Sequence, residues 1–134
     1  MKLASLRTGG RDGTLIVVSR DLSRAVAVPD IAPTLQSALH GWANLSPRLA
    51  TVAEALEAGN VATINGMDVF AVDPQALAAP LPRAYEFVDG SAYLPHVARV
   101  RRARGAQVPE TFYTDPLMYQ ATSAGFLGPR DPVL

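Results

Sequence analysis

Three short apolar runs open the chain, and turn residues separate each from the next. We predict strands over residues 2–7, 14–18 and 24–28. Three glycines and an aspartate join the first two runs, and these residue types supply the positive φ angles of a hairpin turn. The unbroken run Leu15-Ile16-Val17-Val18 is typical of a strand buried on both faces. This pattern predicts a small antiparallel meander that needs a covering layer, because a short sheet cannot bury its apolar face alone.

Two helical stripes follow and predict that cover. Over residues 33–42, apolar side chains recur at positions i, i+3, i+4 and i+7, which predicts a helix that ends at Trp42. After a break, Ser46 has the chemistry of an N-cap, and Pro47 suits the first position of a second helix over residues 47–58. We interpret Trp42 as an anchor of the core, with a partner-binding surface as the alternative.

A hairpin and a proline-bounded connector close the first unit. Residues 61–64 and 67–72 flank Asn65-Gly66, the strongest two-residue hairpin signal. The prolines of the connector that follows fix φ and disfavour helix in the residues before them. We therefore predict a domain boundary here, with an N-terminal α+β cap at residues 1–78 and a second domain beginning within residues 79–134.

The second unit is predicted as a strand, a helix and an extended run. The strand is expected over residues 84–88, and the helix is expected to end at Arg104. Pro95 belongs in the first turn of that helix, because a proline in a helix interior costs about 3 kcal/mol or more. His96 then lies in the first turn as well, and residues 112–120 form an extended, partly buried run. The fold class is therefore α+β: a small antiparallel β-meander covered by two helices, followed by a strand-helix-strand segment.

Charge and composition narrow the classes of function. The 12 basic and 12 acidic residues cancel, so no net field favours nucleic acid or an anionic membrane surface. No run approaches the roughly 18 apolar residues of a membrane span. The chain contains no cysteine, and its N-terminus lacks the apolar region of a secretory signal. We expect a cytoplasmic protein that binds neither nucleic acid nor membrane.

The candidate chemistry lies near the predicted strand–helix junction. Taken singly, Asp89 is more typical of a turn or cap aspartate and His96 of a structural histidine, but as a pair they suggest a metal-binding carboxylate and a general base. The arginine-rich run 99–104 is either a solvated helix face or the source of one guanidinium that grips a substrate carboxylate. Tyr93 shares a helical face with His96, and Tyr119 either presents its hydroxyl group or packs. One carboxylate cannot hold Mg²⁺ or Ca²⁺, which take about six or more oxygen ligands.

Several segments resemble the fumarylacetoacetate hydrolase (fumarylacetoacetase) family. The matching segments are Pro80-Leu81-Pro82-Arg83-Ala84-Tyr85, Asp89-Gly90-Ser91-Ala92-Tyr93 with His96, Arg102-Ala103-Arg104-Gly105, Pro109-Glu110, Thr114-Asp115-Pro116-Leu117-Met118-Tyr119-Gln120 and Phe126-Leu127-Gly128-Pro129-Arg130-Asp131-Pro132. The opening, from Ser19 to Val26, is similar to the N-terminal domain of the bacterial branch of that family.

The resemblance implies a chemistry and a set of roles. Family members hydrolyse carbon–carbon bonds in β-diketo acids of the acylpyruvate or fumarylacetoacetate type, or run related decarboxylase, isomerase and hydratase reactions, with Mg²⁺, Mn²⁺ or Ca²⁺ as cofactor. By resemblance, Asp89 is a metal ligand and His96 is the general base. Tyr119, Arg104 and Tyr93 are implied to bind the substrate.

The resemblance also implies an incomplete catalytic domain. The chain is much shorter than family members usually are, and it contains no Glu-x-Glu pair. We therefore expect residues 79–134 to be the first part of a β-rich catalytic domain, with a separate catalytic domain as a partner. We expect neither tight metal binding nor activity from this chain alone. A non-catalytic assembly or regulatory module, or a degenerate paralogue, are the open alternatives.

Overall fold

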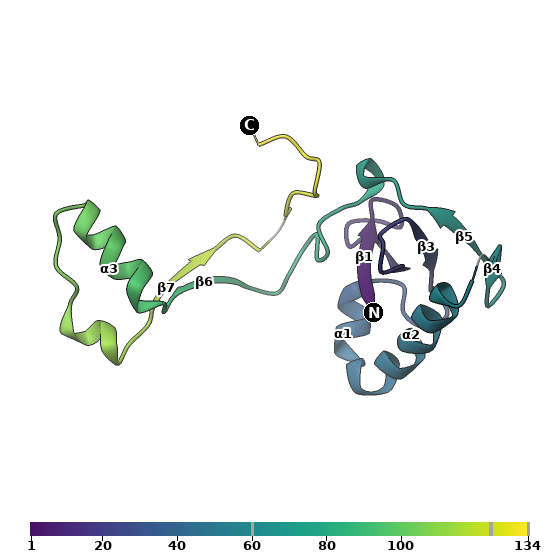
Figure 1. The fold of residues 1–134 in the computed structure, drawn as a ribbon, viewed down its shortest axis with the longest axis horizontal. Coiled ribbons are helices and arrows are strands. Elements are labelled where there is room, and N and C mark those ends of the chain that lie inside the picture. Colours follow the sequence, from purple (N-terminus) through teal and green to yellow (C-terminus); the bar gives the residue numbers. More distant parts are fainter. Residues whose placement is uncertain (60, 124, 134) are drawn as a thin grey trace. The chain divides into compact units, whose positions relative to one another are not determined.

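A computed structural model describes residues 1–59, 61–123 and 125–133, which pack as two units. The first unit comprises residues 1–84 with 125–133, and the second comprises Tyr85–Ser123. Figure 1 shows the elements in chain order. They are β1 (Lys2–Leu6), β2 (Thr14–Val18), β3 (Arg24–Ala27), α1 (Leu35–His40), α2 (Trp42–Glu57), β4 (Thr63–Ile64), β5 (Met67–Ala71), the 3₁₀ turn η1 (Pro74–Ala76), β6 (Phe87–Ser91), α3 (Leu94–Ala103), the 3₁₀ turn η2 (Glu110–Tyr113) and β7 (Leu117–Ala121).

The first unit is built on an antiparallel sheet with strand order β1-β2-β3-β5-β4. The meander β1–β2–β3 is thus confirmed, and the second hairpin extends it by pairing β5 with β3. In β2, Leu15, Ile16 and Val17 are fully buried. Alternate residues of a strand face opposite sides of the sheet, so this central strand is covered on both faces, as its unbroken apolar run predicts.

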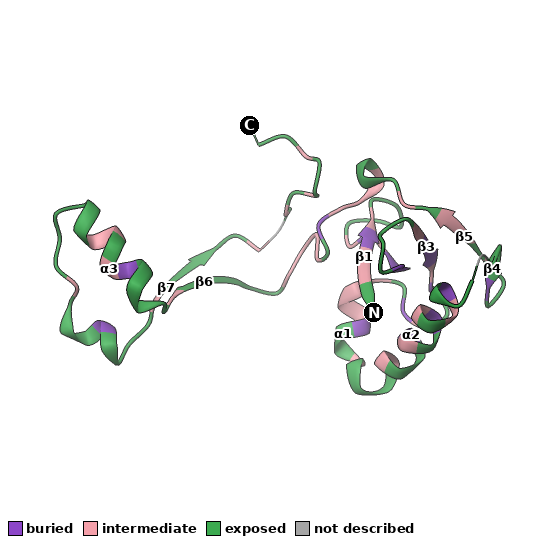
Figure 2. Cartoon of the chain, in the orientation of Figure 1, coloured by how far each residue is buried: buried purple, intermediate pink, exposed green. Residues whose placement is uncertain are grey.

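Two helices cover one face of the sheet. Leu49, Val52 and Leu56 of α2 are buried and pack in one cluster with Leu15 and Val17 of β2. The other face carries a smaller cluster around Ile16, Val18 and Ala25, packed against side chains of the connector after β5. Figure 2 shows buried residues gathered in this sheet and on the inner sides of α1 and α2. The α+β class and the two covering helices are therefore as predicted.

Two details of the helical layer were predicted wrongly. The second helix begins at Trp42 and runs through Pro47, so Ser46 is not its N-cap. The first helix ends at His40, and Gly41 turns the chain before Trp42. Trp42 therefore does not continue the stripe of the first helix. Its ring is 40% exposed instead of anchoring the core.

The turn between β4 and β5 is the one predicted. Asn65 and Gly66 adopt φ angles of 53° and 76°. A type I′ hairpin turn needs two consecutive residues with positive φ, and these two residues supply them. Asparagine tolerates this region better than most residues, and glycine occupies it without a steric penalty. Local sequence alone therefore specifies this turn.

Contacts from distant segments close the first unit. The Ser5 hydroxyl group donates to the carbonyl oxygen of Pro80 at 2.6 Å. Arg7 pairs with Asp131, 124 residues later in the chain. These contacts bring the connector and the segment 125–133 into the first unit, which extends through residue 84. The domain boundary expected after residue 78 stays a prediction.

The second unit consists of the hairpin β6–β7, α3 and η2. Its first strand spans Phe87–Ser91 instead of the predicted 84–88, so Asp89 lies within the strand and not after it. The predicted extended run divides into η2, which buries Phe112, and β7. Val97 and Phe112 are its buried apolar residues among those described. Within the described parts of both units, no helix is long and apolar enough to cross a membrane.

Candidate active site

The start of α3 positions His96. Tyr93 is the N-cap residue in an extended conformation, with φ −83° and ψ 100°. Pro95 occupies the first turn, where its missing N–H group has no helical partner to lose. The first helical bond runs from the Val97 N–H group to the Tyr93 carbonyl oxygen at 3.1 Å. His96 is therefore held in the first turn, as the proline predicts.

The register of the hairpin positions Asp89 and Tyr119. Asp89 pairs with Tyr119, and Ser91 pairs with Leu117. Residues directly opposite in an antiparallel pair project to the same face, and so do residues two apart in one strand. All four side chains therefore share one face of the β6–β7 ribbon.

A pocket of about 360 Å³ lies between α3 and that face of the ribbon. It is lined by Ser91, His96, Val97, Val100, Arg101, Arg104, Leu117 and Tyr119. Three of the five candidate residues, His96, Arg104 and Tyr119, thus converge on one cavity. Asp89 shares the ribbon face but does not line the cavity, and Tyr93 lies outside it, 74% exposed.

The electrostatic character of this pocket suits an anion. Arg101 and Arg104 lie one helical turn apart on the side of α3 that faces the ribbon, and no Asp or Glu side chain lines the cavity. Two guanidinium groups with no neighbouring acid favour a carboxylate, which arginine binds in a bidentate manner. The arginine-rich run is therefore not only a solvated face, since two of its members reach a cavity.

Sequence reasoning did not select Arg101 or Ser91. Arg101 belongs to the predicted arginine-rich run, and it lies four residues after Val97 and three before Arg104, a spacing that places these three residues on one side of a helix. That spacing is the signal that identifies it. Ser91 carries no such signal, because the register of the hairpin decides which side it faces.

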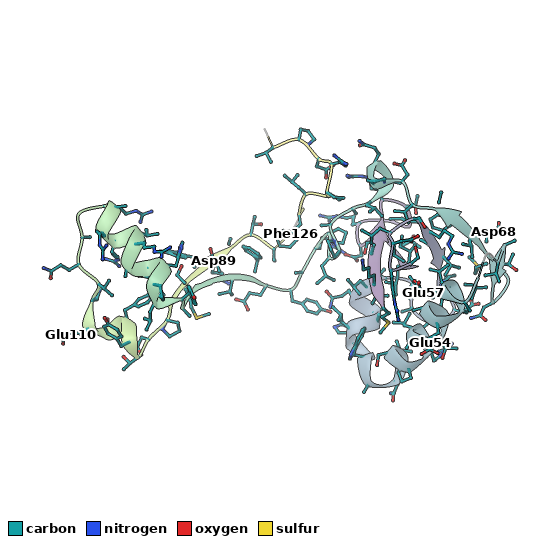
Figure 3. The ribbon with its side chains drawn as sticks, viewed as in Figure 1. Glu54, Glu57, Asp68, Asp89, Glu110 and Phe126 are labelled. Atoms are coloured by element: carbon teal, nitrogen blue, oxygen red, sulfur yellow. The ribbon has the colours of Figure 1, made fainter. Side chains whose placement is uncertain are left out.

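The described residues do not form a metal centre by themselves. No group of three or more His, Cys, Asp or Glu side chains that could hold a metal ion occurs in residues 1–59, 61–123 and 125–133. In Figure 3, Asp89 lies on the hairpin of the second unit and Glu110 lies apart from it at η2, so these two carboxylates do not converge. A hard divalent cation takes about six oxygen ligands. Asp89 therefore needs partners from other residues to form such a site.

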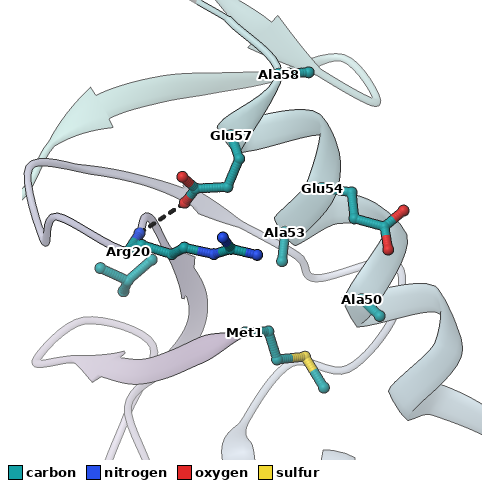
Figure 4. A pocket seen from close by; sticks show the side chains of 8 residues that line it. Met1, Arg20, Ala50, Ala53, Glu54, Glu57 and Ala58 are labelled. Atoms are coloured by element: carbon teal, nitrogen blue, oxygen red, sulfur yellow. Dashed lines mark hydrogen bonds between the residues drawn. The ribbon is translucent and has the colours of Figure 1, made fainter.

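A second pocket, of about 380 Å³, belongs to the first unit and is shown in Figure 4. The pocket is lined by Met1, by the end of β2 and the residues just after it, and by the last two turns of α2. The backbone N–H group of Arg20 donates to Glu57 Oε1 at 2.7 Å, and Glu54 lines the opposite side. One guanidinium and two carboxylates give this pocket charges of both signs. None of the five candidate residues belongs to it.

Comparison with known proteins identifies the first unit. No curated protein matches the chain. Residues 1–83 match the family model described as Fumarylacetoacetase N-terminal domain 2. The match ends where the first unit's connector reaches Arg83, and it covers the sheet, both covering helices and the second hairpin. The chain therefore belongs to the fumarylacetoacetate hydrolase family and contains its fumarylacetoacetase-type N-terminal domain.

Proposed function

We propose that this chain supplies the N-terminal domain and the first catalytic segment of a divalent-metal-dependent hydrolase that cleaves carbon–carbon bonds in β-diketo acids. The observation that carries the proposal is the convergence of His96, Arg104 and Tyr119 on one cavity of the second unit. A base, a carboxylate-binding group and a hydroxyl group are the groups that hydrolysis of an acylpyruvate or fumarylacetoacetate-type substrate needs. The family membership of residues 1–83 supports the same conclusion.

Each side chain has a role in this proposal. Arg104, with Arg101 beside it, binds the substrate carboxylate, and Tyr119 donates its hydroxyl hydrogen to a substrate oxygen. An imidazole nitrogen of His96 accepts a proton from water as the water oxygen attacks the acyl carbonyl carbon. The bond to the neighbouring carbon then breaks, and that carbon takes up a proton. Positioned general-base catalysis of this kind contributes typically about 10²–10⁴-fold to the rate.

The metal ligands are the part that this chain does not complete. The described residues do not fit a Mg²⁺ site on their own, because Asp89 has no second and third carboxylate beside it. We therefore assign Asp89 as one ligand of a set that a separate catalytic domain completes, and we assign Tyr93 to the substrate entrance. Tyr93 lies 74% exposed, which is compatible with a contact that forms only in that assembly.

A reconstitution experiment tests this function. The 134-residue chain is mixed with a separately expressed catalytic domain of a fumarylacetoacetase-like hydrolase, and loss of acetylpyruvate absorbance is followed with Mg²⁺ or Mn²⁺ in the buffer. We expect turnover only from the mixture, and His96→Ala is expected to lower it by about 10²–10⁴-fold. The matched control is His40→Ala, which changes the other histidine and leaves the rate unchanged. A mixture whose rate is indifferent to His96→Ala would contradict the assigned base.

One observation favours a second function, that of a non-catalytic assembly or regulatory module: the family match ends at residue 83. All five candidate residues lie after residue 83, outside the matched domain. In that case, the chain binds the catalytic domain and alters its assembly or rate, while His96→Ala, Arg104→Ala and Tyr119→Phe change nothing. The same reconstitution therefore separates the two functions.

A further inference from the structure

The first unit contains a larger pocket on the sheet face opposite α1 and α2. It has a volume of about 640 Å³, within the range of small-molecule sites. Its walls are the start of β1, the turn after β2, the connector that follows β5, and the turn at Pro129-Arg130. None of its lining residues belongs to Tyr85–Ser123, so it is complete within the first unit.

The floor and sides of this pocket are apolar. Ala4, Val18, Val72 and Leu77 belong to the smaller core cluster, and all four also line the pocket. Leu22 adds an apolar side chain that is 56% exposed. An apolar surface left open in this way is a feature of binding sites.

The backbone of Leu22 is held in an unfavourable conformation. Its φ angle is 65°, in the left-handed region that leucine rarely adopts. The turn is fixed by Asp21, whose carboxylate accepts hydrogen bonds from the hydroxyl groups of Ser19 and Ser23 at 2.6 and 2.8 Å. Strained residues persist where the surrounding structure imposes them, and they concentrate at ligand contacts. The Ser19–Asp21–Ser23 network thus presents Leu22 at the rim.

Two cations and no acid line the same pocket. They are Lys2 and Arg130. The Lys2 ammonium group donates to the carbonyl oxygen of Arg20 at 2.7 Å, which leaves two further N–H groups. Across the described residues, the Arg130 guanidinium group has no hydrogen bond or ion pair. The two cations complement an anion on an otherwise apolar ligand.

The wall that carries Arg130 is firmly attached. Asp131 pairs with Arg7 through one oxygen, and its other oxygen accepts the Gly128 N–H group at 2.7 Å. A Cβ atom at Gly128 would lie 2.6 Å from the carbonyl oxygen of Leu77, so only glycine permits this approach. The pocket is therefore preformed by contacts within the first unit.

We propose that this pocket binds a small amphipathic carboxylate, with an apolar body on Ala4, Val18, Leu22 and Leu77 and its carboxylate between Lys2 and Arg130. The apolar lining supplies burial, and the cation pair supplies the preference for an anion over a neutral molecule of the same shape. The mixed charges of the pocket at Arg20, Glu54 and Glu57 lack this preference.

The test is a titration of the ¹⁵N-labelled 134-residue chain followed by amide chemical shifts, with 4-phenylbutyrate as the probe. Saturable shifts are expected at Ala4, Val18, Leu22 and Arg130. Neutral 4-phenylbutyramide and short butyrate are each expected to bind about tenfold or more weakly, because each lacks one of the two complementary parts.

Variants make the assignment specific. Arg130→Gln is expected to weaken 4-phenylbutyrate about tenfold, while Arg48→Gln on α2 serves as the matched control and leaves the affinity unchanged. Unaltered shifts elsewhere establish that each variant is folded. Equal binding of acid and amide, equal effects of the two arginine variants, or shifts at another surface would overturn the proposal. So would sedimentation that shows a dimer which 4-phenylbutyrate dissociates, because a second copy of the chain would then occupy this pocket.

Discussion

Arg83 forms a bidentate ion pair with Asp12. Its Nε donates to Asp12 Oδ1 at 2.7 Å, and its Nη2 donates to Oδ2 at 2.6 Å. The two residues are 71 positions apart in the chain. Their ion pair connects the end of the fumarylacetoacetase N-terminal domain, residues 1–83, to the turn between β1 and β2. The hydrogen bonds from Arg83 lower the pKa of the Asp12 carboxyl group below its ordinary value.

Removing the Arg83–Asp12 ion pair should lower the thermal stability of the first unit. Asp12→Asn removes the charge and one of the two acceptors, so we expect the midpoint of thermal unfolding to fall by a few degrees, and Arg83→Ala should cause a similar drop. Differential scanning calorimetry measures both. The double variant should lose little more than either single variant, because both remove the same contact. Fully additive losses would show that the two side chains act independently.

Trp42 and Leu49 should differ in their contribution to stability. Leu49 is fully buried, so Leu49→Ala is expected to lower the free energy of unfolding by about 2–5 kcal/mol. Trp42→Ala removes a larger side chain but one that is 40% exposed, and we expect a smaller loss than for Leu49→Ala. Urea denaturation measures both. A larger loss for Trp42→Ala would mean that the indole ring is part of the core.

Pro47 should be a destabilising residue. It is the sixth residue of α2, where it removes a helical hydrogen bond donor. Pro47→Ala restores the donor and is expected to raise the free energy of unfolding by about 1–3 kcal/mol. Arg48→Ala, at the next position of the same helix, is the control and should stay within about 0.5 kcal/mol. A destabilised Pro47→Ala variant would instead favour a helix that starts at Pro47.

Acid should weaken the attachment of the C-terminal segment. The N–H group of Gly128 and then the Arg7 side chain lower the pKa of Asp131 below its ordinary value. A carboxyl group with a lowered folded-state pKa stabilises the fold above its unfolded pKa of about 3.9, and this contribution is lost as the pH falls through the folded value. We therefore expect a falling unfolding midpoint below about pH 4.

The Asp131→Asn variant isolates that contribution. It should unfold at a lower temperature than the native chain at pH 7, and the difference should shrink as the pH falls below about 4. Asp68→Asn on β5 is the matched control and should follow the native profile. A difference between Asp131→Asn and the native chain that is constant from pH 7 to pH 3 would contradict the linkage.

Local physics let the sequence by itself determine most elements of the first unit. The apolar run at residues 15–18 specifies a central strand because every side chain in it must be buried, whichever face it takes. Asn65-Gly66 specifies its turn because few other residue pairs accept two positive φ angles. Pro95 favours the first turn of α3 because a proline at a later position costs about 3 kcal/mol, which this helix, with Val97 as its buried residue, has little packing to offset.

Tertiary packing decided the features that sequence patterns predicted wrongly. Pro47 carries the local signal of a helix start, yet burial of Leu49, Val52 and Leu56 stabilises a helix that continues through it. Trp42 has the right spacing for the core, but Gly41 turns the chain and changes the direction of its side chain. Burial of several apolar side chains outweighs the preference of one residue.

In the candidate site too, the sequence identified the residues and the tertiary structure decided which of them come together. Resemblance selects Asp89, Tyr93, His96, Arg104 and Tyr119 from the sequence. Only the pairing register of β6 with β7 and the rotation of α3 about its axis decide that three of them share a cavity and that Tyr93 does not. A shift of one residue in that register would turn Tyr119 to the opposite face of the ribbon. The register depends on contacts between segments about 30 residues apart, such as Glu86 with Gln120, which no local pattern specifies.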